Sequence, residues 1–164
     1  MTTDQATRFG SAERGADGVT VAFERQFEAP AAKVWRALTE PGELAQWLAD
    51  ASVDLRIGGA IQVRFDDGVM NGTITELVPN ELLSYTWLEG DGRESHVTWQ
   101  LGAISDSATT LKLVHRRLAV ESSSGFLGGW HHHLDRLEAV VGGSTMEWSW
   151  ATYEELEEIY RARV

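Results

Sequence analysis

The chain has 164 residues, of which 25 are Asp or Glu and 14 are Lys or Arg, so its formal net charge is −11 at pH 7. A surface this acidic repels phosphate backbones and anionic lipid, which disfavours binding to nucleic acid or to a membrane surface. The absence of cysteine excludes disulfides, thiolate metal sites and a cysteine nucleophile. No apolar run approaches the roughly 20 residues of a membrane span, and residues 1–18 lack the apolar stretch of a signal peptide. We therefore expect a soluble cytoplasmic protein.

The first part of the chain changes character near residue 18. Residues 1–17 are polar, mixed in charge and interrupted by glycine, which predicts a flexible leader. A period-2 pattern then predicts a strand, with apolar side chains at Val19, Val21, Phe23 and Phe27. Arg25 is the one charged residue on that apolar side.

Two short helices are expected next. Pro30 and Pro41 each suit the first turn of a helix, where the missing N–H of proline costs nothing. The second helix, over residues 42–48, spaces its apolar side chains three and four apart at Leu44, Trp47 and Leu48.

The middle of the chain is a series of predicted strands joined by turn signals such as Asp67-Gly68 and Pro79-Asn80. Alternating side chains share one face, at Ile61, Val63, Phe65, Leu83, Tyr85, Trp87, Val97, Trp99, Leu101, Leu111, Leu113 and His115. Only the strand over residues 69–78 has an ambiguous inward face. This spacing is typical of an antiparallel meander with one face against a core.

The period then changes to 3.6 over residues 125–141, which predicts a long helix that ends at Gly142-Gly143. Its apolar stripe is Phe126, Trp130, Leu134, Leu137 and Val141. Such a helix buries its stripe by lying across the concave face of the sheet. We therefore expect an α+β domain over residues 18–143.

Residues 144–164 form an acidic C-terminal extension, in which Thr152–Glu155 fits a capping box. A narrow apolar stripe among the glutamates predicts a short amphipathic helix. This helix can pack back on the domain or contact a second copy of the chain, and we favour packing back because isolated helices need tertiary contacts.

Several segments resemble one known family. FERQFEAPAAKVWRALTEPGELAQW is similar to the opening of the heat-shock protein 90 ATPase activator homologue family, which is part of the START-like (polyketide cyclase, Bet v-type, SRPBCC) superfamily. DLRIGGAIQVRF, GTITELVPNELLSYTW and TTLKLVHRRL resemble its later segments. The resemblance covers roughly residues 19–142 and implies a helix-grip fold, in which a curved antiparallel sheet wraps around a long C-terminal helix. It does not imply one activity, because binders, enzymes and co-chaperones share this scaffold.

The helix-grip fold implies a cavity between the sheet and the long helix. Its expected ligand-binding wall is Trp47, Phe65, Tyr85, Trp87, Trp99, Leu113, His115, Phe126 and Trp130. A wall that is mostly aromatic with few polar groups suits a small apolar or aromatic ligand. The alternative is that these rings, from a chain with seven tryptophans, fill the core completely.

The weak catalytic candidates are Arg25, Tyr85 and His115. A buried neutral imidazole can exchange a proton near pH 7, and the other two side chains can polarise a carbonyl in a dry cavity. No orienting partner for His115 is visible in the sequence, so a structural role is favoured for it and for Arg25.

The triplet His131–His133 raises the question of a metal site. Consecutive helical residues point about 100° apart, so three neighbours cannot converge on one ion. Only His131 and Asp135, four residues apart, could share one. We therefore expect no metal and no cofactor, with His133 bordering the buried stripe and the other two histidines solvated.

Three functions remain open. The first is binding of a small hydrophobic molecule, and the second is an enzyme of the cyclase, dehydratase or hydrolase type that uses the same cavity. The third, a heat-shock protein 90 co-chaperone, is implied by the family resemblance alone. A homodimer is a further open possibility, because the acidic extension and the edge strands could pair with a second copy.

Overall fold

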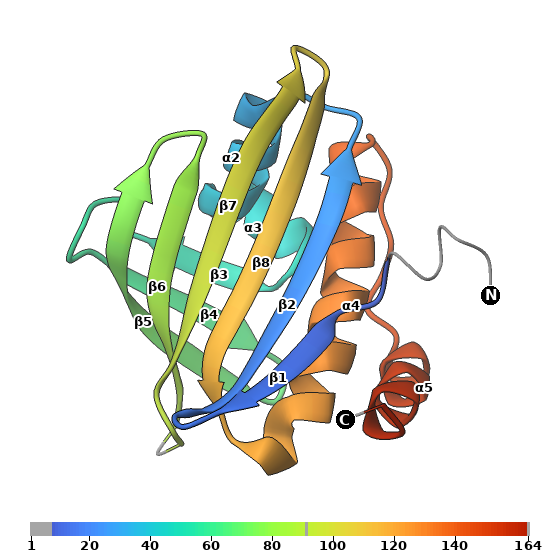
Figure 1. Cartoon of the computed structure of the whole chain (residues 1–164). Helices are drawn as coiled ribbons and strands as arrows, with labels where there is room; N and C mark the ends of the chain where they lie inside the picture. The colour runs from blue at the N-terminus through green and yellow to red at the C-terminus, as the bar shows by residue number, and fades with distance from the viewer. Residues whose placement is uncertain (1–7, 91, 164) are drawn as a thin grey trace.

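One curved sheet of eight antiparallel strands wraps around a long helix in the computed structural model, which describes residues 8–90 and 92–163 (Figure 1). The strand order is β1-β2-β8-β7-β6-β5-β4-β3. Helix α4 (Ser123–Val141) lies along the concave face, and α2 (Ala31–Thr39) and α3 (Pro41–Trp47) cover the rest of that face. The predicted α+β helix-grip fold is confirmed.

The strand order follows from the position of the two short helices. After β2 (Gly18–Phe27), helices α2 and α3 carry the chain across the concave face to the opposite edge of the sheet. The meander then returns toward β2 through β3 (Asp50–Val53), β4 (Ala60–Phe65), β5 (Gly68–Val78), β6 (Leu82–Glu89), β7 (Ser95–Ser105) and β8 (Ala108–Leu118). Strand β8 pairs with β2, so the first long strand and the last lie side by side.

The predicted inward face of the meander is correct. Every predicted inward side chain of β4, β6, β7 and β8 is buried except that of Phe65, which is half-buried. In β5, Met70 and Ile74 are buried while Val69 is exposed. A register irregularity between Ile74 and Glu76 explains why the β5 pattern is ambiguous, because an extra residue changes which face the following side chains take.

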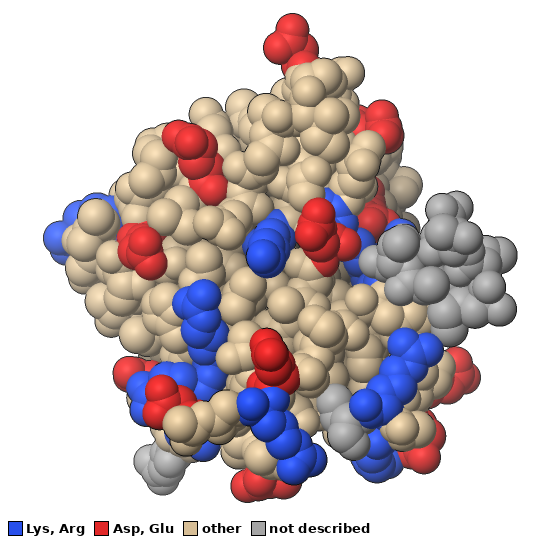
Figure 2. All heavy atoms as spheres, in the orientation of Figure 1, with Lys and Arg blue, Asp and Glu red and all other residues tan. Residues whose placement is uncertain are grey.

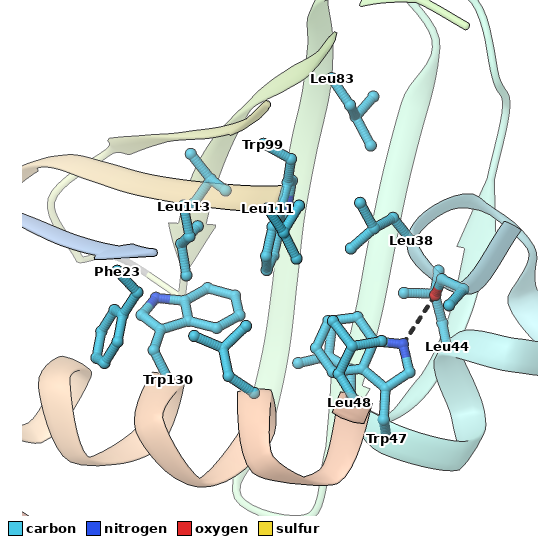
Figure 3. Close-up of a cluster of buried hydrophobic side chains, with 14 of the residues drawn as sticks. Phe23, Leu38, Leu44, Trp47, Leu48, Leu83, Trp99, Leu111, Leu113 and Trp130 are labelled. Carbon is cyan, nitrogen blue, oxygen red and sulfur yellow. Dashed lines mark hydrogen bonds between the residues drawn. The ribbon is translucent and has the colours of Figure 1, made fainter. Parts of the chain in front are cut away.

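The core between α3, α4 and the sheet is filled by indole rings. Trp47 meets Trp99 edge to face with ring centroids 6.0 Å apart, and Trp99 meets Trp130 at 5.4 Å. The indole N–H of Trp47 donates to the Ala37 carbonyl at 2.8 Å, which is the hydrogen bond drawn in Figure 3. In this half of the molecule the inward-facing rings occupy the core.

The prediction of a flexible leader over residues 1–17 is wrong for part of that segment. Ser11–Gly15 forms edge strand β1, which pairs with β2 from Ser11↔Ala22 to Gly15↔Gly18. Most of its side chains are exposed, so backbone hydrogen bonds rather than burial define the strand, and its sequence shows no apolar alternation. Residues 1–7 lie outside the described part of the chain.

The C-terminal extension packs back on the domain. Helix α5 (Trp150–Arg161) begins before the predicted capping box, because Ser149 is its N-cap and accepts a hydrogen bond from the Thr152 N–H at 3.2 Å. Tyr160 of α5 is only 1% exposed. The two helices approach closely at Gly128, where a Cβ atom would lie 3.0 Å from the backbone nitrogen of Glu157. Among the described residues, no helix is both long and apolar enough to cross a membrane.

Candidate functional site

A cavity of about 580 Å³ lies between the first half of α4, the ends of β4 and β6, the α3–β3 junction and the C-terminal extension. Ligand sites commonly have volumes of roughly 300–1,000 Å³, so the space can hold a small organic molecule. Its aromatic wall consists of Phe65, Trp87, Phe126, Trp130, Trp148, Trp150 and Tyr153.

The structure divides the predicted ligand-binding residues into two groups. Phe65, Trp87, Phe126 and Trp130 line the cavity. The other five do not line it and belong to the packed interior, namely Trp47, Tyr85, Trp99, Leu113 and His115. Trp130 contacts both groups, because its ring lies 5.3 Å from Trp87 and 5.4 Å from Trp99. The filled core and the open cavity therefore coexist in one molecule, on either side of this indole.

Three aromatic side chains of the wall come from the C-terminal extension, which the sequence did not connect with the cavity. Trp148 stacks on His133 of α4 with ring centroids 4.5 Å apart and an interplanar angle of 24°. Trp150 and Tyr153 follow it on the same side of the cavity. The available signal was their close spacing, since three large aromatic residues occur within six positions of an otherwise acidic segment.

The three consecutive histidines of α4 have different partners. Nδ1 of His131 lies 2.7 Å from the Tyr160 hydroxyl, and Nε2 of His132 accepts from the Ser149 backbone N–H at 2.9 Å. Nδ1 of His133 donates to the Trp47 carbonyl at 3.0 Å. The expectation that His131 and His132 are solvated is wrong, since they are 5% and 2% exposed. The C-terminal extension covers both rings.

Burial makes these imidazoles poor bases. It lowers the pKa of His131 to about 4 and that of His133 to about 3. His133 is the only one of the three that lines the cavity, and it is neutral at pH 7. Because its Nδ1–H is used by the Trp47 carbonyl, its Nε2 atom is a hydrogen-bond acceptor.

His115 has the orienting partners that the sequence does not reveal. The indole N–H of Trp130 donates to its Nδ1 atom at 3.0 Å. Nε2 must therefore carry the proton of the neutral ring, and it donates to Ser95 Oγ at 2.7 Å. Burial lowers the pKa of His115 to about 3. This histidine holds the Trp130 ring in place and does not itself line the cavity.

The other two catalytic candidates lie elsewhere in the molecule. Arg25 is 4% exposed and donates to Asp135 at 2.9 Å and to the Arg8 carbonyl at 2.8 Å. The hydroxyl of Tyr85 accepts from the Trp99 indole N–H at 2.9 Å, and burial raises its pKa to about 12. Neither side chain lines the cavity. The candidates Arg25, Tyr85 and His115 thus do not converge on one place.

The charged residues that line the cavity are mostly acidic. They are Asp50, Asp66, Asp67, Glu89, Glu121 and Glu157, with the two cations Arg64 and Arg136. Burial and the nearby carboxylate of Asp67 raise the pKa of Glu89. Burial and the Glu157 carboxylate raise the pKa of Tyr153 to about 12. Negative charges therefore outnumber positive charges around the cavity.

A curved antiparallel sheet that closes around one long helix defines the helix-grip class of proteins. Residues 28–142 match the family model described as Activator of Hsp90 ATPase homolog 1-like protein, and the chain belongs to this family. The resemblance stated from the sequence is thereby confirmed. A search of curated proteins finds no significant match.

Solved structures share the fold over most of the chain. CalU16 from Micromonospora echinospora is 23% identical, with a TM-score of 0.77 over 93% of this chain and 94% of that one. A conserved protein of unknown function from Enterococcus faecalis, EF2215, is 18% identical, with a TM-score of 0.79 over 99% of this chain and 96% of that one. The Aha1 dimer from Colwellia psychrerythraea is 20% identical, with a TM-score of 0.68 over 74% and 95%. At these identities the similarity establishes the fold.

Proposed function

We propose that the protein binds a small hydrophobic or aromatic molecule in the cavity between α4, the ends of β4 and β6, and the C-terminal extension. The observation that carries this proposal is an open space of about 580 Å³ walled by seven aromatic side chains, next to a core in which similar rings pack on one another. The aromatic part of this wall favours a ligand with an apolar or aromatic body, because burial of the ligand surface supplies most of the binding free energy.

Binding is favoured over catalysis by the same geometry. General acid–base chemistry needs two or more groups within hydrogen-bond reach of one reacting atom. Arg25, Tyr85 and His115 are held by partners outside the cavity. His133 lines the cavity, but its pKa of about 3 makes it a weak proton acceptor. The co-chaperone alternative has support from family membership alone, and a pull-down with heat-shock protein 90 would test it.

A cavity-filling variant tests the binding site. Gly129 of α4 lines the cavity, and a Cβ atom there would meet nothing closer than the Tyr153 ring at 3.8 Å. Gly129→Leu should fill the space while it raises helix propensity, so lost binding cannot be assigned to a lost fold. Gly42→Leu is the matched control, since Gly42 lies in α3 away from the cavity and nothing lies within 4 Å of its added Cβ.

Native mass spectrometry of the freshly purified protein should detect a co-purified small molecule. The Gly129→Leu variant should lack it, and the Gly42→Leu variant should retain it. Thermal melting should show that both variants are folded. The proposal fails if the wild-type protein carries no molecule and a panel of aromatic compounds leaves its tryptophan fluorescence unchanged, or if Gly129→Leu binds as the wild type does.

A further inference from the structure

We infer that the ligand of this cavity is an organic cation, namely a protonated amine or quaternary ammonium group attached to an apolar or aromatic body. The inference rests on the proposed function, because it specifies the ligand class for the same cavity. It follows from the combination, around one cavity, of aromatic rings and carboxylates that form no ion pair.

The aromatic side chains of the cavity come from three separate parts of the chain. Trp87 belongs to β6, Trp130 to α4, and Trp148 with Tyr153 to the C-terminal extension. Trp87 and Trp130 lie 5.3 Å apart, and Trp148 and Tyr153 lie 5.6 Å apart. The face of an aromatic ring carries a partial negative charge, and indole is the strongest such group among side chains, so aromatic side chains in a cavity wall can stabilise a bound cation.

Both positive side chains of the cavity are already engaged. Arg64 donates to Asp50 Oδ2 at 2.7 Å and to Gln62 Oε1 at 2.8 Å. Arg136 donates to the carbonyls of Trp47 and Met146 at 2.7 and 2.9 Å. Asp50 therefore compensates the charge of Arg64, and backbone carbonyls hold the guanidinium of Arg136 in place.

Negative charge is in excess around the cavity. Within the described residues, Asp66, Asp67, Glu89 and Glu121 line the cavity and form no ion pair, and Glu157 pairs only with Arg161 of its own helix at 3.2 Å. Burial first, and then repulsion by the Asp67 carboxylate, raise the pKa of Glu89. A bound cation would relieve that repulsion. The outer face of the sheet, by contrast, mixes acidic and basic side chains (Figure 2).

A second observation independently points to a ligand at this wall. Trp87 is 4% exposed, and its indole N–H has no hydrogen-bond partner in the described part of the molecule. The Glu89 carboxylate lies near this N–H, which partly offsets the rise in the pKa of Glu89. The two groups form no hydrogen bond of normal geometry. The buried indole N–H of Trp148 on another wall is likewise unpartnered. Buried donors usually have partners, so a ligand with an acceptor oxygen besides its cation would complete the site.

Matched probes test the charge preference directly. The cation (2-naphthylmethyl)trimethylammonium has nearly the same shape as neutral 2-neopentylnaphthalene, in which carbon replaces the nitrogen, and 2-naphthylacetate supplies the anion. Titrations followed through the indole N–H signals of ¹⁵N-labelled protein report directly on the tryptophans of the wall. We expect the cation to bind about tenfold more tightly than the neutral probe, the anion to bind most weakly, and added salt to weaken only the cation.

A charge-removing variant assigns the preference to the named carboxylates. Asp67→Asn combined with Glu89→Gln should weaken binding of the cation severalfold and leave the neutral probe unchanged. Glu154→Gln, an exposed position of α5 that does not line the cavity, is the matched control. If the neutral probe or the anion binds as tightly as the cation, the inference is overturned while the proposed function stands. If none of the three probes binds, both the inference and the proposed function fail.

Discussion

The indole N–H of Trp130 donates to Nδ1 of His115 across 3.0 Å, and this hydrogen bond joins α4 to β8 at the boundary between the packed core and the cavity. His115 in turn donates to Ser95 of β7. One imidazole therefore sets the position of the ring that ends the core on one side and lines the cavity on the other. Its function is positional, since it does not line the cavity itself.

Replacement of His115 by phenylalanine should lower the free energy of unfolding by about 1–3 kcal/mol, because the buried N–H of Trp130 loses its acceptor while the volume is nearly kept. Urea denaturation measures the change. His96→Gln is the control on the neighbouring strand, where the side chain bonds to Thr75 at the surface, and it should change the free energy by less than about 0.5 kcal/mol. Equal losses in the two variants would contradict the assigned role.

Stability should fall as the pH is lowered through the histidine range. The pKa of each of the five histidines is below its ordinary value of 6.5, mainly through burial, and reaches about 3 for His115. The unfolded chain therefore binds more protons than the folded one between pH 6.5 and pH 3, and the free energy of unfolding rises with pH in that window. The stabilising contribution of the buried, neutral histidines to the free energy of unfolding is fully present above about pH 6.5. Glu43 and Glu89, whose pKa values are raised, make contributions of the opposite sign.

Urea denaturation at pH 7.5, 6.0 and 5.0 measures this dependence. The wild-type protein should lose stability at each step, and His115→Phe should show a shallower slope because one of the displaced titrations is gone. An unfolding free energy that is constant from pH 7.5 to 5.0 would show that the histidines titrate normally in the folded state.

The docking of α5 depends on the hydroxyl of Tyr160. This atom accepts from the Gly10 N–H at 2.8 Å and contacts His131 Nδ1 at 2.7 Å, so it ties the C-terminal extension to α4 and to the segment before β1. Tyr160→Phe should destabilise the protein by about 1–3 kcal/mol, since it leaves buried polar groups unpaired. Tyr153→Phe removes only a 3.4 Å contact with Glu157, and thermal melting should show a much smaller effect. Similar melting temperatures for the two variants would argue against this role.

Two adjacent glycines of α4 should respond oppositely to alanine. Gly128→Ala would put a Cβ atom 3.0 Å from the Glu157 backbone nitrogen and 3.1 Å from its Cα, so α5 must move away. Gly129→Ala meets only the Tyr153 ring at 3.8 Å. We expect Gly129→Ala to stabilise the protein by about 0.5–1 kcal/mol through helix propensity, and Gly128→Ala to lower its stability. Hydrogen exchange of α5 amides should increase only in Gly128→Ala, and an unchanged rate would contradict the close approach.

Local periodicity was enough to predict the scaffold. Alternation in the strands placed Tyr85, Trp87 and Trp99 on the inward face, and the 3.6-residue period placed Trp130 and Leu134 on the buried stripe of α4, as the structure has them. These patterns are readable because side-chain direction in a regular element depends only on position along that element. Strand β1 was not predicted because most of its side chains are exposed and show no apolar alternation, while backbone pairing with β2 holds it in the sheet.

Which inward-facing rings reach the cavity was decided by tertiary structure. Tyr85 and Trp87 share a strand and a face, yet only Trp87 lines the cavity, because the Trp99 ring lies beside Tyr85 and donates a hydrogen bond to its hydroxyl. The burial of His131 depends on Tyr160 of α5, which is 29 residues further along the chain, and Trp148 reaches the cavity through its stacking on His133. The amino-acid pattern was sufficient to predict which face each side chain takes, since local backbone geometry sets that face. Only the packing of distant segments decided where the core ends and the cavity begins.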